Sequence, residues 1–173
     1  DSMSLLEIIS LKDIETAINN LPSSIKSSKQ AISETIENNV RQKIIKENLI
    51  DPAFYSEMSI LLQEIIKERK ANAISYEEYL KKIAGLAKNV FTGNAGNLPP
   101  KLKTKGQVAL YNNLEKDENL AIVLDEAVKY VKKADWRGNQ QKENEIKREL
   151  FNVLNDTGEV ERIFSIIKQQ NEY

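Results

Sequence analysis

Residues 51–90 read DPAFYSEMSILLQEIIKERKANAISYEEYLKKIAGLAKNV, and the spacing of their apolar residues decides the fold. Apolar side chains recur at intervals of three and four residues, which places them along one face of an α-helix. One such stripe consists of Met58, Leu61, Leu62, Ile65 and Ile66, and a second consists of Leu80, Ile83, Ala87 and Val90. No alternation of apolar and polar residues is long enough for a half-buried strand. The stretch therefore predicts two consecutive helices whose stripes face a core.

Both of these helices carry a start signal. Asp51 stands directly before Pro52, and an aspartate N-cap followed by proline at the first helical position is a favoured helix start. Ser75 is followed three residues later by Glu78, which fits a capping box. These signals predict helix starts at residues 52 and 76.

The same helical period extends outward from this stretch through the rest of the chain. A further apolar stripe consists of Val123, Leu124, Ala127, Val128 and Val131. The predicted elements are a short opening turn at 3–9 and helices near 11–20, 28–48, 52–70, 76–91, 105–115, 118–133, 140–154 and 158–170. We therefore predict an all-α fold, an irregular bundle of about seven to nine helices.

Two breaks interrupt the helical pattern. Residues 92–104 read TGNAGNLPPKLKT, in which two glycines and a Pro-Pro pair stop a helix and favour extended backbone. We expect this loop to divide the single predicted domain, residues 1–173, into sub-lobes 1–91 and 105–173. The second break, residues 135–139, contains the only tryptophan of the chain, a large aromatic in a turn.

The composition excludes several classes of protein. A chain of 173 residues is long enough for one core that buries roughly 70% of the unfolded surface. Its 40% hydrophobic and 29% charged residues are typical of a globular domain. Since no apolar run approaches the roughly 18 residues of a membrane span and no basic segment opens the chain, we expect a cytoplasmic protein. The absence of Cys and His excludes disulfides, thiol nucleophiles, imidazole proton transfer and the usual zinc sites.

Two stretches imitate catalytic motifs without their chemistry. Residues 93–101, GNAGNLPPK, differ from a phosphate-binding loop, which needs Lys and Ser/Thr directly after its last Gly at a helix start. Asp135, Glu145 and Lys147 have the spacing of magnesium nucleases. However, Glu145 and Lys147 stand two residues apart in a predicted helix and therefore point to different faces. We expect no catalytic, cofactor-binding or metal-binding residues in this chain.

Two sets of residues remain as candidates for contact with a partner. The formal net charge is −1, so any contact with DNA must be local. Lys101, Lys103 and Lys105 are the candidate DNA contacts, and the alternative for them is a solvated connector. Trp136 and Arg137 are the candidate partner-binding residues, because Trp and Arg are enriched at interfaces. The alternative for this pair is a buried anchor with a neighbouring cation.

Four pieces of the sequence, taken in order, resemble one protein family. Residues 51–90 resemble the carboxy-terminal helical region of the R (restriction) subunits of type I restriction-modification enzymes, including the Ile-Ser-Tyr-Glu-Glu-Tyr-Leu start of the second helix. Residues 107–114, QVALYNNL, are similar to the family's short Ala-Leu-Tyr helix. Residues 135–139, DWRGN, look like its closing Trp-Arg segment, and residues 163–173, IFSIIKQQNEY, look like its natural end. The resemblance covers residues 51–173, and none of the pieces is a catalytic motif.

The resemblance implies a division of labour within a longer subunit. R subunits of this family carry a magnesium-dependent nuclease domain and two RecA-like motor domains that hydrolyse ATP, followed by a helical region that helps to dock the subunit on the methyltransferase core. The implied role of this chain is a non-catalytic assembly module without ATP or Mg²⁺ of its own. Its implied partners are the methyltransferase (M) and specificity (S) subunits, and DNA through the complex. The alternative is a direct DNA-binding module that guides the duplex near the motor through the lysines of the 92–104 loop and Lys105.

Overall fold

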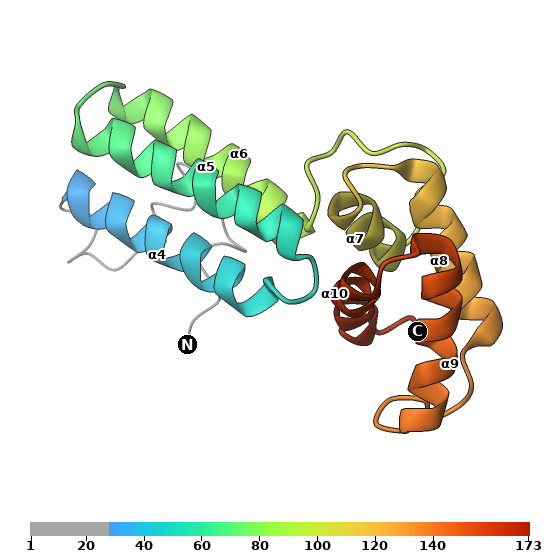
Figure 1. The fold of residues 1–173 in the computed structure, drawn as a ribbon. Helices are drawn as coiled ribbons and strands as arrows, with labels where there is room; N and C mark the ends of the chain where they lie inside the picture. Colours follow the sequence, from blue (N-terminus) through green and yellow to red (C-terminus); the bar gives the residue numbers. More distant parts are fainter. Residues whose placement is uncertain (1–27) are drawn as a thin grey trace. The chain divides into compact units, whose positions relative to one another are not determined.

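The computed structural model describes residues 28–173 (Figure 1). Its helices are α4 (Lys29–Glu47), α5 (Pro52–Lys70), α6 (Tyr76–Thr92), α7 (Lys105–Asn113), α8 (Glu118–Val131), α9 (Gln140–Leu154) and α10 (Thr157–Lys168). The described residues contain no β-strand, so the predicted all-α fold is confirmed for them. The predicted bounds of these seven helices agree with the observed ones to within two residues. The predicted turn at 3–9 and helix at 11–20 lie outside the described residues.

Asp51 and Ser75 cap α5 and α6 as predicted, but of the capping box predicted for Ser75 and Glu78 the structure shows only the Ser75 bond. The Asp51 carboxylate accepts the backbone N–H of Phe54 at 3.2 Å, and the Ser75 hydroxyl accepts the backbone N–H of Glu78 at 3.1 Å. Both bonds satisfy a backbone donor that the first turn of a helix leaves without a partner. Gly93 ends α6 with a positive φ of 81°, a conformation that glycine adopts without steric cost.

The chain divides into two compact units. The described part of the first, the N-terminal unit, comprises residues 28–48 and 55–96. The second, the C-terminal unit, comprises Leu49–Phe54 and Asn97–Tyr173. The predicted sub-lobes, 1–91 and 105–173, placed the connection between α4 and α5 in the first lobe. In the structure this connection and the first turn of α5 belong to the C-terminal unit.

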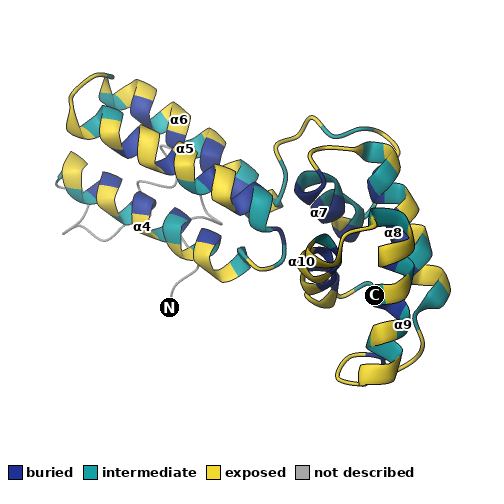
Figure 2. Ribbon diagram, viewed as in Figure 1, coloured by how far each residue is buried: buried dark blue, intermediate teal, exposed yellow. Residues whose placement is uncertain are grey.

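In the N-terminal unit, α4, α5 and α6 lie side by side (Figure 1). Buried and exposed positions alternate along each helix, as expected of helices with one face toward a core (Figure 2). Within this unit, the buried hydrophobic residues of the three helices are Ile32, Ile36, Val40, Ile44, Tyr55, Met58, Leu62, Ile65, Ile66, Tyr79, Ile83, Leu86, Ala87 and Val90. The predicted stripes on α5 and α6 therefore supply half of these residues, and α4 supplies four more.

Two members of the predicted stripes are exposed. Leu61 is 37% exposed and Val123 is 46% exposed, whereas their neighbours Leu62 and Leu124 are almost completely buried. Successive residues of an α-helix point about 100° apart, so one of two adjacent apolar residues can lie at the edge of the buried face while the other lies at its centre. The prediction that Leu61 and Val123 face the core was wrong for this reason.

A buried carboxylate joins the three described helices of the N-terminal unit. Glu37 on α4 is 4% exposed, and the Arg69 guanidinium on α5 donates to both of its oxygens, at 2.6 and 2.8 Å. The Tyr79 hydroxyl on α6 donates to the same carboxylate at 2.7 Å. Burial and the bond to Glu37 raise the pKa of Tyr79 above its usual range, while the bond to Glu37 raises the pKa of Arg69. Both oxygens of the Glu37 carboxylate are thus hydrogen-bonded, which offsets part of the cost of burying them.

The C-terminal unit packs α7, α8, α9 and α10 around a second core (Figure 1). Its buried members are Leu102, Ala109, Leu110, Leu114, Ala121, Leu124, Val128, Trp136, Ile146, Leu150, Val160, Ile163, Phe164, Ile166, Ile167 and Tyr173. Residues from the turn between α8 and α9 and from the segment after α10 thus belong to the core. Both segments contribute to the candidate sites described below.

Replacing Arg69 with Met tests the importance of the buried ion pair. The change leaves the Glu37 carboxylate buried without its cation, so we expect the free energy of unfolding to fall by about 3–5 kcal/mol. Lys82→Met is the matched control, because Lys82 pairs with Glu68 on the surface, where the two side chains are 47% and 34% exposed. The control should cost less than about 1 kcal/mol. Urea denaturation followed by circular dichroism measures both free energies of unfolding. Equal losses in Arg69→Met and Lys82→Met would show that the buried ion pair matters no more than the surface pair.

Candidate functional site

The only tryptophan is an internal anchor of the C-terminal unit. Trp136 is 2% exposed, and its indole N–H donates to the main-chain oxygen of Tyr173 at 2.9 Å. Its ring meets the Phe164 ring edge to face, with 5.7 Å between centroids and 63° between planes. This is a favourable aromatic geometry with the polar N–H satisfied. Of the two alternatives for Trp136, the burial agrees with the anchor, and the indole offers no surface to a partner.

Arg137 lies over that anchor and holds the end of α10. Its guanidinium is 4.4 Å from the centroid of the Trp136 ring, within the range of a cation–π contact. It donates to the main-chain oxygen of Lys168 at 3.1 Å and to that of Gln170. Because Arg137 itself is exposed, it remains the one member of the Trp-Arg pair that a partner can reach. Partner binding by Arg137 stays a prediction.

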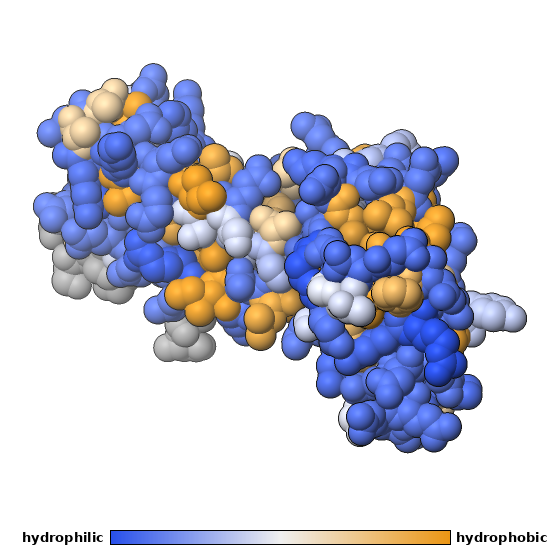
Figure 3. Space-filling model, viewed as in Figure 1, coloured by the Kyte–Doolittle hydropathy of each residue, from blue (hydrophilic) through white to orange (hydrophobic). Residues whose placement is uncertain are grey.

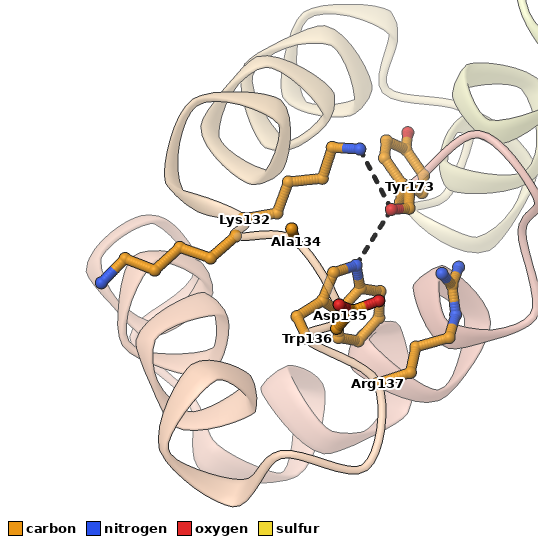
Figure 4. Close-up of a pocket in the computed structure, with 7 residues that line it drawn as sticks. Lys132, Ala134, Asp135, Trp136, Arg137 and Tyr173 are labelled. Atoms are coloured by element: carbon orange, nitrogen blue, oxygen red, sulfur yellow. Dashed lines mark hydrogen bonds between the residues drawn. The ribbon is translucent and has the colours of Figure 1, made fainter.

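A hollow of about 370 Å³ lies beside this turn. It is lined by Lys132, Lys133, Ala134, Asp135, Trp136, Arg137 and Tyr173. In Figure 4 the Lys132 ammonium and the Trp136 indole converge on the same main-chain oxygen of Tyr173, and the ammonium lies 3.0 Å from it. Lys133 pairs with Glu145 at 2.9 Å. These groups hold the turn and the last residues together, and they do not converge on the empty space of the hollow.

The nuclease-like spacing does not produce a site in the described residues. Glu145 pairs with Lys133, whereas Lys147 pairs with Glu161 at 3.0 Å. Asp135 is exposed in the turn with a φ of 55°. Glu145 and Lys147 therefore bind different partners, as two residues on different faces of a helix must. Residues 28–173 contain no group of three or more Asp and Glu side chains that could hold a metal ion.

The lysine loop is exposed but anchored. Lys101, Lys103 and Lys105 are all exposed, while Leu102 between them is buried. The Gln107 side chain accepts the backbone N–H of Lys103 at 2.7 Å and completes a capping box at the start of α7. The backbone of this segment is thus held in place while the three ammonium groups face solvent. DNA contact by these lysines stays a prediction.

The most perturbed acid of the C-terminal unit was assigned only a capping role by the sequence. Asp51 is 4% exposed and accepts the side-chain amides of Asn112 at 2.9 Å and Asn113 at 2.8 Å. Burial raises the pKa of Asp51 to about 6, although its hydrogen bonds, that of Asn112 first, act in the opposite direction. The available sequence signal was Asn113, which follows Ala109 and Leu110 at helical spacing and so falls on the buried face of α7.

An apolar groove of about 280 Å³ lies beside Asp51 and Asn113, with Asn113 in its lining. It is lined by Leu49, Pro52, Asn113, Arg162, Ser165, Ile166 and Gln169, all in the C-terminal unit. Leu49 is 64% exposed. Arg162 on the rim donates to the main-chain oxygen of Asn113 at 2.9 Å and pairs with Glu159. The lining combines apolar side chains with polar ones, as surfaces that bind other proteins do.

A third polar cluster fixes the segment after α10. Asp125 is 2% exposed and accepts bonds from Gln107, Lys129 and the Tyr173 hydroxyl. Burial and the bond to Asp125 raise the pKa of Tyr173 above its usual range. Glu172 accepts the backbone N–H at the start of α7. These contacts tie the last residues of the C-terminal unit to α7 and α8.

Comparisons with known proteins give no relative. No family model, curated protein or solved structure matches the chain. None of the helices within residues 28–173 has the length and apolar character to cross a membrane. The structural basis for a function is therefore the chemistry of the chain's own surface, above all the groove beside Leu49 and the exposed lysines.

Replacing Trp136 with Ala tests the internal anchor. Because a large buried aromatic is removed, we expect the free energy of unfolding to fall by roughly 3–5 kcal/mol. Tyr130→Ala is the matched control, since Tyr130 is 93% exposed and its removal should change stability by less than about 0.5 kcal/mol. Thermal and urea unfolding followed by circular dichroism give both values. A Trp136→Ala variant that unfolds like the parent would refute the anchor.

Proposed function

We propose that this chain is a non-catalytic helical assembly domain. In this proposal it is the carboxy-terminal part of the R subunit of a type I restriction enzyme, and it docks the motor and nuclease subunit on the methyltransferase core. The order of the four sequence pieces supports the family. The groove beside Leu49 is the observation that carries the docking role.

The groove suits a protein partner for physical reasons. Leu49 exposes most of its side chain to water, which is unfavourable by about 25 cal/mol for each Å² of apolar surface. Pro52 and Ile166 continue the apolar lining. An apolar side chain of a partner would remove this surface from water, while Gln169 and Arg162 offer hydrogen bonds at the rim. Patches of apolar side chains between hydrophilic ones are visible on the face of the molecule in Figure 3.

The polar clusters of the two units fit a structural role. Glu37, Asp51 and Asp125 are each hydrogen-bonded to side chains of other helices, so their geometry holds the fold. In the proposal the chain itself hydrolyses no ATP and cuts no DNA, and ATP and Mg²⁺ act on other parts of the longer subunit. Its partners are the M and S subunits in the cytoplasm, and it meets DNA through the complex.

A second candidate function is direct binding of duplex DNA through the lysine loop. The exposure of Lys101, Lys103 and Lys105 on an anchored backbone supports it. Three such cations can bind a few phosphates, and the resulting affinity is modest and salt-dependent. This candidate differs from the first in the partner and in the surface that binds it.

Replacing Leu49 with Glu tests the docking role. The charge cannot enter an apolar contact without losing its hydration, so we expect binding to the purified methyltransferase core to weaken by about ten-fold or more. Val123→Glu is the matched control, because Val123 is an exposed apolar residue on α8 outside the groove. Isothermal titration calorimetry measures both affinities after the melting temperatures are checked. Equal affinities of the two variants would exclude the groove as the docking surface.

Replacing the three loop lysines with Gln tests the second candidate. If the loop binds duplex DNA, the slope of log K against log salt should become shallower by about 0.9 for each phosphate that the variant no longer neutralises. The matched control replaces Lys43, Lys82 and Lys147, which already pair with carboxylates, with Gln. Fluorescence anisotropy with a labelled duplex of about 20 base pairs at low salt measures both. The same affinity and slope in the two triple variants would reject DNA binding by this loop.

A further inference from the structure

We infer that Asp51, Asn112 and Asn113 form a proton-dependent lock, which holds the connection between α4 and α5 in the C-terminal unit and changes its hydrogen bonding with the proton state of Asp51. This inference concerns the chain alone. It does not depend on the partner proposed for the groove, although Leu49 and Pro52 on either side of Asp51 line that groove.

The lock acts on a short segment between two longer helices. Leu49–Phe54 groups with the C-terminal unit, whereas α4 and the rest of α5 group with the N-terminal unit. The bonds to Asp51 hold the middle of this segment. Gln170 secures its other side by donating to the main-chain oxygen of Ile50 at 2.8 Å. These bonds join the segment to α7 and to the residues after α10.

Asn113 has a fixed amide orientation. Its amide nitrogen donates to the Asp51 carboxylate at 2.8 Å and to the main-chain oxygen of Ala109 at 2.7 Å. Its amide oxygen accepts the backbone N–H of Ala53 at 3.1 Å. Turning this amide would break all three bonds, so Asn113 can serve only as a donor to Asp51. One oxygen of the carboxylate, Oδ1, is therefore bound by donors in either proton state.

Asn112 is the movable member. Within the described residues its amide makes one hydrogen bond, from Nδ2 to the other carboxylate oxygen of Asp51, Oδ2, at 2.9 Å. When Asp51 takes up a proton from solvent on Oδ2, the new O–H needs an acceptor. A half-turn of the Asn112 amide brings its oxygen to that place. The ionised lock thus has Asn112 as a donor, and the protonated lock has Asn112 as an acceptor.

Burial, and not a neighbouring charge, is the main influence on the proton state of Asp51. From α7 it meets only the two asparagine amides, and the first turn of α5 contains no acidic residue. From α10, Arg162 bonds the main-chain oxygen of Asn113 and pairs with Glu159. Desolvation is the largest effect and raises the pKa of Asp51 from 3.8 to about 6. The lock therefore changes its proton state close to neutral pH.

The sign of the effect on stability follows from linkage. A carboxyl whose pKa is higher in the folded chain takes up a proton on folding between the two pKa values. Its contribution to stability is complete below pH 3.8 and is lost as the pH rises through about 6. Between about pH 5 and about pH 7.5 this one group should increase the unfolding equilibrium constant about ten-fold.

Nuclear magnetic resonance of the full chain tests the lock directly. Between about pH 4.5 and about pH 8, the side-chain amide signals of Asn112 and Asn113 and the backbone N–H of Phe54 should titrate together with a midpoint near 6. Asp51→Asn should abolish this titration. Asp117→Asn is the matched control, because Asp117 caps α8 through Leu120 and is exposed, and it should leave the titration unchanged. A midpoint of about 4, the ordinary value of an aspartate, or no common titration would overturn the inference.

Two further measurements keep the test decisive if Asp51→Asn does not fold. Asn112→Ala removes the bond to Asp51 in both proton states, and the lost bond to the charged form is the stronger one, so the midpoint followed on Asn113 should move upward. Urea unfolding at about pH 5 and about pH 7.5 should show the roughly ten-fold change in the wild-type chain and in Asp117→Asn. An unmoved midpoint in Asn112→Ala, or unfolding constants that do not change with pH in this direction, would refute the lock.

Discussion

The cost of burying a carboxylate constrains both units of this protein. Glu37, Asp51 and Asp125 are each less than 5% exposed, and an ionised group in such a place needs donors from its surroundings. In each case at least one donor comes from another helix: Arg69 for Glu37, the α7 asparagines for Asp51, and Gln107 for Asp125. Helices that pack only through apolar stripes can rotate and slide, whereas these bonds require one relative position within each unit.

The helices themselves could be predicted from the sequence because their signals are local. Spacing of three and four residues identifies a helix wherever it occurs, and Asp51-Pro52 and Ser75 mark starts through bonds that span three residues. The exact buried face was harder to predict, since Leu61 and Leu62 are adjacent leucines of the same apolar stripe and only Leu62 is buried. Which of the two is buried depends on the helices that α5 packs against, and the periodicity of the sequence does not contain this information.

The candidate sites depended on contacts between distant residues and were therefore harder to predict. Asp51 and Asn113 are 62 residues apart, and Trp136 bonds a main-chain oxygen 37 residues later. The sequence offered Trp136 as an anchor or an interface residue, and only the path of the residues after α10 decides its burial. Both alternatives for the loop lysines, contact with DNA or a solvated connector, require exposed side chains, and the exposure of a lysine follows from its charge without tertiary information.

The place of the single tryptophan makes it a spectroscopic reporter of one unit. Trp136 lies in the core of the C-terminal unit beside Phe164 and Arg137, and the sequence contains no other tryptophan. Its emission therefore follows the C-terminal unit alone, whereas the helical circular dichroism signal sums over both units. Coincidence of the two signals during denaturation would indicate a single cooperative transition, and separation would show that the two cores unfold independently.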